Sequence, residues 1–95
     1  MNASLRDLEV LIVDDDAFMI KLTKRILKRL GIEHAQQAKD GAAALQCLDG
    51  STVDVVVCDL NMPGMDGRAF LRHLADREAQ PDVPRRLAAI LVDGI

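Results

Sequence analysis

Short apolar runs alternate with longer segments of mixed character along this 95-residue chain. The runs at 8–13, 53–58 and 87–92 are almost continuously apolar, which is typical of strands buried on both faces. A weaker run at 33–38 contains two glutamines and a histidine, so we expect it only as a strand at the edge of a sheet. The pattern therefore predicts four strands.

Three segments between these runs show the 3.6-residue period of amphipathic helices, and they span 17–30, 41–49 and 66–78. Asp16 is placed to cap the first of these helices and Gly31 to end it. One side of the first helix carries Met19, Leu22, Thr23, Ile26, Leu27 and Leu30, and the other carries Lys21, Lys24, Arg25, Lys28 and Arg29. The inward residues are expected to be Ala44, Leu45 and Leu48 in the second helix and Phe70, Leu71 and Leu74 in the third.

The predicted order alternates strand and helix from the first strand to the fourth. Such alternation with buried strands predicts an α/β fold with a parallel sheet and right-handed crossovers. Ninety-five residues are enough for one domain.

Composition narrows the classes of function. Only 2% of the residues are aromatic, so the core must be aliphatic. A net charge of −3 argues against general nucleic-acid binding, which needs a basic surface. No apolar run reaches the length of a membrane span, and the first residues have no signal-peptide pattern. Cys47 and Cys58 lie in apolar patterns without metal-binding or redox spacing, which predicts reduced core residues and a cytoplasmic protein.

Carboxylates follow two of the predicted strands at their carboxyl ends. Asp14, Asp15 and Asp16 come directly after the first strand, and Asp59 follows the third. Active sites of open parallel sheets lie beyond these ends, so the acids are expected to converge if the two strands are neighbours. A divalent cation would relieve their repulsion, and Mg²⁺ prefers such oxygen ligands. Taken singly, each acid could instead cap a helix or form a turn.

Few reactions are open to such a site. The sequence has no Ser/His/Asp set in context, no glycine-rich phosphate loop and no thiol motif. His34 and His73 have no partner motif, so we interpret them as surface residues. A carboxylate beside Mg²⁺ can, however, attack phosphorus and form an aspartyl phosphate.

Three motifs support this chemistry together. They are LIVDDD at 11–16, the pair Asp40–Gly41 before the second helix, and VDVVVCDLNMPGMDG at 53–67. In these motifs the chain resembles the CheY-like receiver domain of bacterial two-component response regulators. The resemblance covers residues 1–95 and implies a flavodoxin-like parallel sheet of strand order 2-1-3-4.

The resemblance also implies a role for each site residue. Asp59 would be the phospho-acceptor and take the phosphoryl group from a sensor histidine kinase or a phosphotransfer protein. Asp15 would bind Mg²⁺ directly, Asp14 largely through water, and the backbone carbonyl of Asn61 would complete the protein's ligands. The loop would be shaped by Met62 and Pro63, with Gly67 allowing its tight turn. Such a domain catalyses only its own phosphorylation and dephosphorylation and is not otherwise an enzyme.

The chain departs from the family after its fourth predicted strand. The family has a Thr or Ser at the end of that strand, where our alignment places Asp93, and a Lys at the end of a fifth strand. Without the last strand and helices, the apolar fourth strand would be an exposed edge. We therefore expect self-association, strand exchange or a partner that completes the fold.

Two other functions fit parts of the pattern. A degenerate pseudo-receiver would bind partners or metal without phosphoryl switching, and Asp93 and the missing Lys favour it. A haloacid-dehalogenase-like phosphohydrolase also uses an aspartate nucleophile, but it needs an acid two residues later, where this chain has Asn61. Neither a nucleic acid nor a membrane is expected as a partner.

Overall fold

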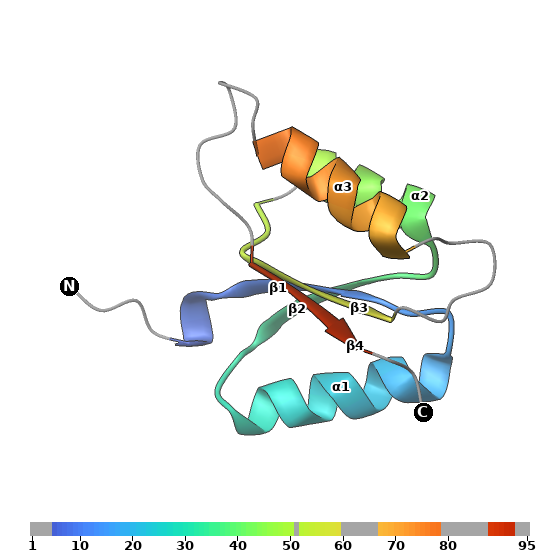
Figure 1. Cartoon of the computed structure of the whole chain (residues 1–95). Coiled ribbons are helices and arrows are strands. Elements are labelled where there is room, and N and C mark those ends of the chain that lie inside the picture. The colour runs from blue at the N-terminus through green and yellow to red at the C-terminus, as the bar shows by residue number, and fades with distance from the viewer. Residues whose placement is uncertain (1–4, 51, 60–66, 79–87, 93–95) are drawn as a thin grey trace.

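The computed structural model describes residues 5–50, 52–59, 67–78 and 88–92 (Figure 1). Its elements are a 3₁₀ helix (Leu5–Asp7), β1 (Glu9–Val13), α1 (Ala17–Arg29), β2 (His34–Ala38), α2 (Gly41–Gly50), β3 (Val55–Asp59), α3 (Gly67–Glu78) and β4 (Ala88–Val92). Each predicted strand and helix is present, with its ends displaced by two residues at most. Periodicity therefore predicted every regular element in the described part of the chain except the first 3₁₀ turn.

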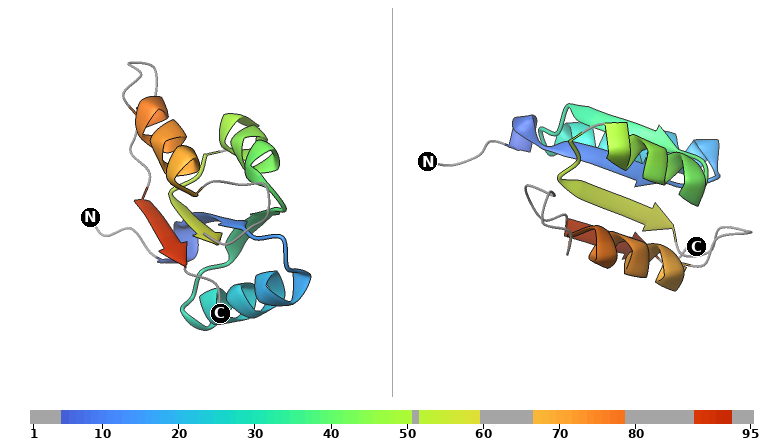
Figure 2. Two further views of the ribbon diagram at one scale, coloured as in Figure 1. Left: turned by 45° about the vertical axis from the view of Figure 1, so that its right-hand side comes forward. Right: turned by 90° about the horizontal axis from the view of Figure 1, so that it is seen from above.

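All four strands are parallel and lie in the order β2-β1-β3-β4, which confirms the predicted flavodoxin-like topology. Helix α1 covers one face of the sheet, and α2 and α3 cover the other (Figures 1 and 2). Strand β1 lies inside the sheet and is buried from Val10 to Val13, as its continuous apolar run predicted. The weakly patterned β2 forms an edge, also as predicted.

The sheet divides the core into two clusters because successive side chains of a strand point to opposite faces. Leu11 and Val13 face one cluster, whereas Val10 and Ile12 face the other. The first cluster comprises Leu11, Val13, Ala38, Ala44, Leu48, Val53, Val56, Cys58, Phe70 and Leu74, and the second comprises Val10, Ile12, Ile20 and Ile32. The inward residues predicted for α2 and α3 are confirmed where described, with Leu45 only half-buried, and the side chain of Leu71 lies outside the described part.

Helix α1 packs differently from the expectation. Its buried residue is Ile20, which the sequence pattern did not single out. Leu22 and Ile26, expected on the packed side, are instead exposed, and so is Leu30, just beyond the end of the helix. The apolar side of α1 is wider than the strip that the sheet covers, so only its edge near Ile20 and Leu27 reaches the core. Helical periodicity shows which residues share a side but not how much of that side is covered.

The ends of α1 follow the predicted signals. The Asp16 carboxylate accepts a hydrogen bond from the Phe18 N–H at 2.9 Å and caps the first turn. Gly31 has φ +92°, the left-handed conformation that ends many helices and that side chains other than glycine rarely adopt. In α2, Asp40 accepts from the Ala43 N–H at 2.7 Å, and Gly41 is the first helical residue.

Gly31 offers a direct test of this helix end. We expect Gly31→Ala to lower the free energy of unfolding by about 1 kcal/mol, because alanine is strained at this φ although nothing lies near its added Cβ. Gly50→Ala is the matched control, since Gly50 also has open space but no positive φ. Urea titrations of the two variants measure the difference, and an equal loss in both would contradict the argument.

Two further expectations concern the cysteines and the membrane. Cys58 is buried, Cys47 is half-buried, and both are free thiols, as the sequence predicted. Among the described residues, no helix has the length and apolar character that crossing a bilayer requires.

Candidate metal centre

The pairing of β1 with β3 brings the predicted acids to one edge of the sheet. The two strands pair in register up to Val13 and Cys58, so the next residues, Asp14 and Asp59, stand side by side. The Asp14 N–H continues the pairing with β2 by donating to the Ala38 carbonyl at 3.0 Å. Asp14 is thus fixed at the tip of the central strand, between two neighbours.

The strand pairing is secured at its other end by Asp54. The Asp54 N–H donates to the Glu9 carbonyl at 2.8 Å, and the Asp54 carboxylate accepts from the Glu9 N–H at 2.9 Å. These two bonds hold the start of β1 against the start of β3. Because a parallel register is continuous, this contact supports the alignment that brings Asp14 beside Asp59.

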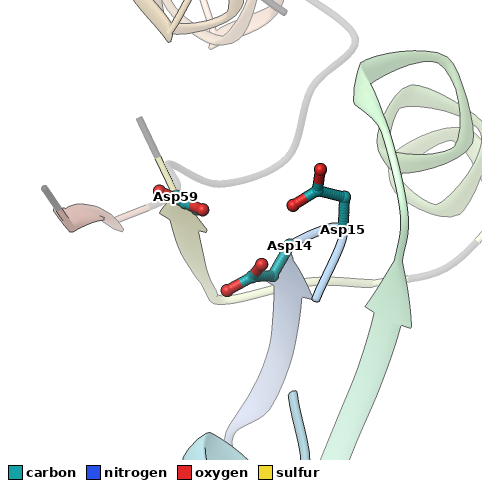
Figure 3. A group of neighbouring side chains, drawn as sticks. All are labelled: Asp14, Asp15 and Asp59. Carbon is teal, nitrogen blue, oxygen red and sulfur yellow. The ribbon is translucent and has the colours of Figure 1, made fainter. Parts of the chain in front are cut away.

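Carboxylate oxygens of Asp14, Asp15 and Asp59 lie within 4.8 Å of one another. Figure 3 shows Asp14 and Asp15 at the tip of β1 and Asp59 at the tip of β3, around a common space. Asp14 is almost buried, Asp59 is half-buried and Asp15 is exposed, so the cluster opens to solvent on one side. The structure therefore brings together the three acids that the sequence analysis proposed as ligands.

Asp14 is held in an environment that does not favour a negative charge. Its burial raises the pKa of its carboxyl group above the usual value, and the nearby charges of Asp59, Asp15 and Asp16 raise it further. The Asp16 N–H donates to the Asp14 carboxylate at 2.9 Å and acts in the opposite direction. The site thus gathers three carboxylates in a partly desolvated place.

The thiol of Cys58, next to the site, is affected by the same negative charges. Burial raises the pKa of Cys58 to about 11, and the charges of Asp59 and Asp14 contribute to the increase. The thiol lies in the cluster between the sheet and the α2–α3 layer, where its S–H donates to the Asp59 carbonyl at 3.5 Å. Cys58 is therefore a protonated core residue at neutral pH rather than a nucleophile or a metal ligand.

The raised pKa of Asp14 predicts how stability depends on pH. Folding raises this pKa above its unfolded value of 3.8. Between these two pKa values, the folded protein therefore binds more protons than the unfolded chain. The contribution of Asp14 to stability therefore falls through this window and stays unfavourable above it. Without divalent cations, Asp14→Asn should be more stable than the wild type at pH 7. The advantage should shrink as the pH falls from the folded pKa to 3.8 and should be lost below that value.

Urea titrations across this pH range, in the presence of a chelator, test the prediction. Asp76→Asn is the control, because Asp76 is an exposed carboxylate on α3, away from the cluster. A stability gain of Asp14→Asn that did not change with pH would show that repulsion at Asp14 is not its cause.

Several predicted site residues lie outside the described residues. These are Asn61, Met62, Pro63 and Asp93, whereas Gly67 is the first residue of α3. Two backbone groups at the site were not predicted, namely the Ala38 carbonyl and the Asp16 N–H. The side-chain pattern contains no signal for either, because both depend on backbone geometry.

Comparison with known proteins agrees with this arrangement. Residues 10–87 match the family described as the response regulator receiver domain. The chain is 42% identical to the chemotaxis protein CheY-3 of Vibrio cholerae over 74 residues, which are 77% of this chain and 57% of that protein. It is 38% identical to the chemotaxis protein CheY of Pseudomonas aeruginosa over 77 residues, which are 81% of this chain and 62% of that protein.

A solved structure shows the same fold. The CheY-like receiver domain from Methylobacillus flagellatus superimposes with a TM-score of 0.77 at 27% identity, over 93% of this chain and 70% of the other. The present chain thus spans about three-fifths of the length of the curated relatives that it matches. The family match and the acidic cluster at the carboxyl ends of β1 and β3 agree, and the chain belongs to the response regulator receiver domain family.

Proposed function

We propose that residues 1–95 form a phosphoacceptor receiver domain in which Asp59 accepts a phosphoryl group in a Mg²⁺-dependent reaction. The observation that carries the proposal is the convergence of three carboxylates within 4.8 Å at the tips of β1 and β3. Asp59 is half-buried yet lies at the open edge of the sheet, as a nucleophile for an external donor must. Membership of the receiver family supports the same assignment.

The residues present fit a magnesium ion. Two oxygens on opposite sides of Mg²⁺ lie about 4 Å apart, so ligand atoms within 4.8 Å of one another need only small movements. In our proposal Asp15 and Asp59 contribute direct ligands, Asp14 acts largely through water, and the Asn61 carbonyl completes the protein's share. A bound Mg²⁺ would supply charge neutralisation for the three acids and for the oxygens of the transferred group.

The reaction then consists of one displacement at phosphorus. A carboxylate oxygen of Asp59 forms a bond to phosphorus as the bond between phosphorus and the donor breaks, and the electron pair of that bond leaves with the donor. With a histidine-phosphorylated kinase or phosphotransfer protein, the imidazole nitrogen of the donor is the leaving group. Burial and the repulsion among the carboxylates raise the pKa of Asp14, and a bound cation would relieve that repulsion.

The same proposal includes association through the sheet. Strand β4 is the outer strand of the sheet within the described residues, and an unpaired strand edge can pair with another chain. We expect this chain to self-associate at micromolar concentration. Sedimentation velocity measures the mass, and a stable monomer over that range would contradict the expectation.

Intact-mass spectrometry of the wild-type chain tests the central proposal. The protein is incubated with acetyl phosphate, once with Mg²⁺ and once with a chelator, and its fold is followed by circular dichroism. We expect a single phosphoryl adduct in the presence of Mg²⁺ and none with the chelator.

A folded chain that acquires no adduct would overturn the proposal. The degenerate pseudo-receiver would then be the better description, since it keeps the acidic cluster but has no phosphoryl switch. Magnesium binding by calorimetry does not separate these two functions, because both retain Asp14, Asp15 and Asp59.

A further inference from the structure

A pocket of about 400 Å³ lies between α1 and the start of β2. The helix, the strand and the short connection between them (Figure 1) all contribute to its lining, which consists of Lys24, Lys28, Ile32, Glu33 and Ala35. Its volume is within the range of small-molecule sites in proteins. The pocket lies near the amino end of β2, whereas the acidic cluster lies at the carboxyl ends of β1 and β3. The two are therefore separate features of the molecule.

The apolar part of the pocket is continuous with the core. Ile32 is a buried member of the second core cluster, and the half-buried Ala35 packs against that cluster. The Ile32 N–H donates to the Leu27 carbonyl at 2.9 Å, and the Gly31 N–H donates to the Lys28 carbonyl at 3.0 Å. These bonds hold the connection against the end of α1 and fix the floor of the pocket. Because the side chain of Ala35 is a single methyl group, it fills little of the space above β2.

The polar part of the pocket carries more positive than negative charge. Lys24 and Lys28 are four residues apart on α1, so they are neighbours on the surface of the helix. Within the described residues, neither lysine forms a salt bridge. Glu33 also lines the pocket, but its carboxylate lies 3.9 Å from the guanidinium of Arg6, which offsets its charge. The pocket therefore combines an apolar floor with two lysines that have no acidic partner.

We propose that this pocket binds a small organic anion, which has one carboxylate or phosphate group on an apolar body. The apolar body lies against Ile32 and Ala35, where its burial removes apolar surface from water. The acidic group lies near Lys24 and Lys28, because lysine side chains can follow an apolar wall with their stems and keep their ammonium groups in water. The proposal does not depend on chemistry at Asp59 and holds or fails independently of the phosphoacceptor function.

The lining of the pocket argues against two other classes of ligand. An organic cation would meet Lys24 and Lys28, and like charges at such a distance repel. An inorganic anion would leave the apolar floor in contact with water and would have only two mobile lysine side chains to hold it. An anion with an apolar body uses both parts of the lining.

A ligand titration followed by ¹H–¹⁵N NMR tests the proposal. The probe is phenylacetate, and its controls are phenethyl alcohol, which lacks the charge, phenethylamine, which reverses it, and acetate, which lacks the apolar body. We expect shifts concentrated on residues 24–35 and a dissociation constant on the order of a few millimolar for a probe of this size. The alcohol should bind about threefold more weakly and the amine more weakly still. Phenyl phosphate, titrated without divalent cations, compares the two kinds of acidic group.

Substitution of Ala35 tests the apolar part of the pocket. Ala35→Leu should weaken the binding of phenylacetate by more than about tenfold, because the larger side chain fills the space that the ligand needs. Ala42→Leu, at an exposed position of α2, is the matched control and should leave binding unchanged. The NMR spectrum of each free variant shows whether it remains folded.

Three charge variants test the polar part, and they do so independently of the alanine variants. Lys24→Gln and Lys28→Gln should each weaken the binding of phenylacetate about threefold. Lys39→Gln, an exposed lysine just beyond the other end of β2, is the control and should have no effect. Glu33→Gln should strengthen binding about twofold, because it removes the one negative charge of the lining.

The other outcomes overturn the proposal. No shift at about 20 mM phenylacetate, or shifts confined to other parts of the chain, would exclude a site for an organic anion in this pocket. Equal binding of the alcohol or the amine would show that charge does not select the ligand, and equal binding of acetate would show that the apolar floor is not used. Binding to phosphatidylglycerol vesicles without binding to the soluble anions would assign the two lysines to a lipid headgroup.

Discussion

Replacement of Asp59 by asparagine is expected to leave the chain without a phosphoryl adduct under conditions that fully modify the wild type. The amide has nearly the shape of the carboxylate, but it is not a comparable nucleophile, and it removes one charge from the three-acid cluster. We expect the rate of modification by acetyl phosphate to fall by more than about 100-fold. Intact-mass spectrometry over time measures both rates.

The control for this variant is Asp76→Asn, which removes an exposed carboxylate of α3 and should be modified like the wild type. Peptide mapping of the modified wild type should locate the phosphoryl group on Asp59. An adduct of equal yield on Asp59→Asn would place the nucleophile on another residue and would refute the assignment.

The largest effect on stability is expected for Leu11→Ala. Leu11 is fully buried in the cluster between the sheet and the α2–α3 layer, on a strand with neighbours on both sides. Removing its side chain loses apolar contacts and leaves a cavity, which costs about 3 kcal/mol. That is a large part of the total stability of a small domain. Urea unfolding followed by circular dichroism should show a midpoint lower by about 2 M.

Leu22→Ala provides the same chemical change at an exposed position of α1. Leu22 is 40% exposed, so the loss of its side chain should cost less than about 1 kcal/mol. Equal losses in the two leucine variants would mean that α1 is packed more tightly than the structure shows.

The sequence predicted the fold well because three of the four strands have an almost continuous apolar pattern. The run at 53–58 predicted β3, although the strand begins at Val55 rather than Val53. At this position the Asp54 N–H still donates to the Glu9 carbonyl, but the Glu9 N–H donates to the Asp54 carboxylate and not to a backbone carbonyl of β3. Apolar patterning cannot show such an exchange of backbone and side-chain hydrogen bonds.

The sequence pattern could not predict how much of α1 is buried against the sheet. The sequence correctly grouped Leu22 and Ile26 on one side of the helix, yet the sheet covers only the edge near Ile20. How much of a helix is buried depends on the width of the layer that it packs against. That width is a property of the assembled sheet and not of the helix sequence.

The candidate site was predicted from topology rather than from local pattern. The rule that parallel strands end at one edge placed Asp14, Asp15 and Asp59 together, and the structure does the same. The unequal exposure of these acids could not be predicted, because it depends on the backbone that surrounds each of them in the folded chain, such as the Ala38 and Asp16 groups that contact Asp14.

The environment of Cys58 has a practical consequence for spectroscopy. A thiol that is fully buried and has a pKa of about 11 hardly reacts with maleimides at neutral pH. Cys47, on α2, is half-buried and is the other free thiol of the chain. A fluorophore or spin label should therefore attach selectively at Cys47 without mutagenesis, which gives a reporter on the helix layer opposite α1.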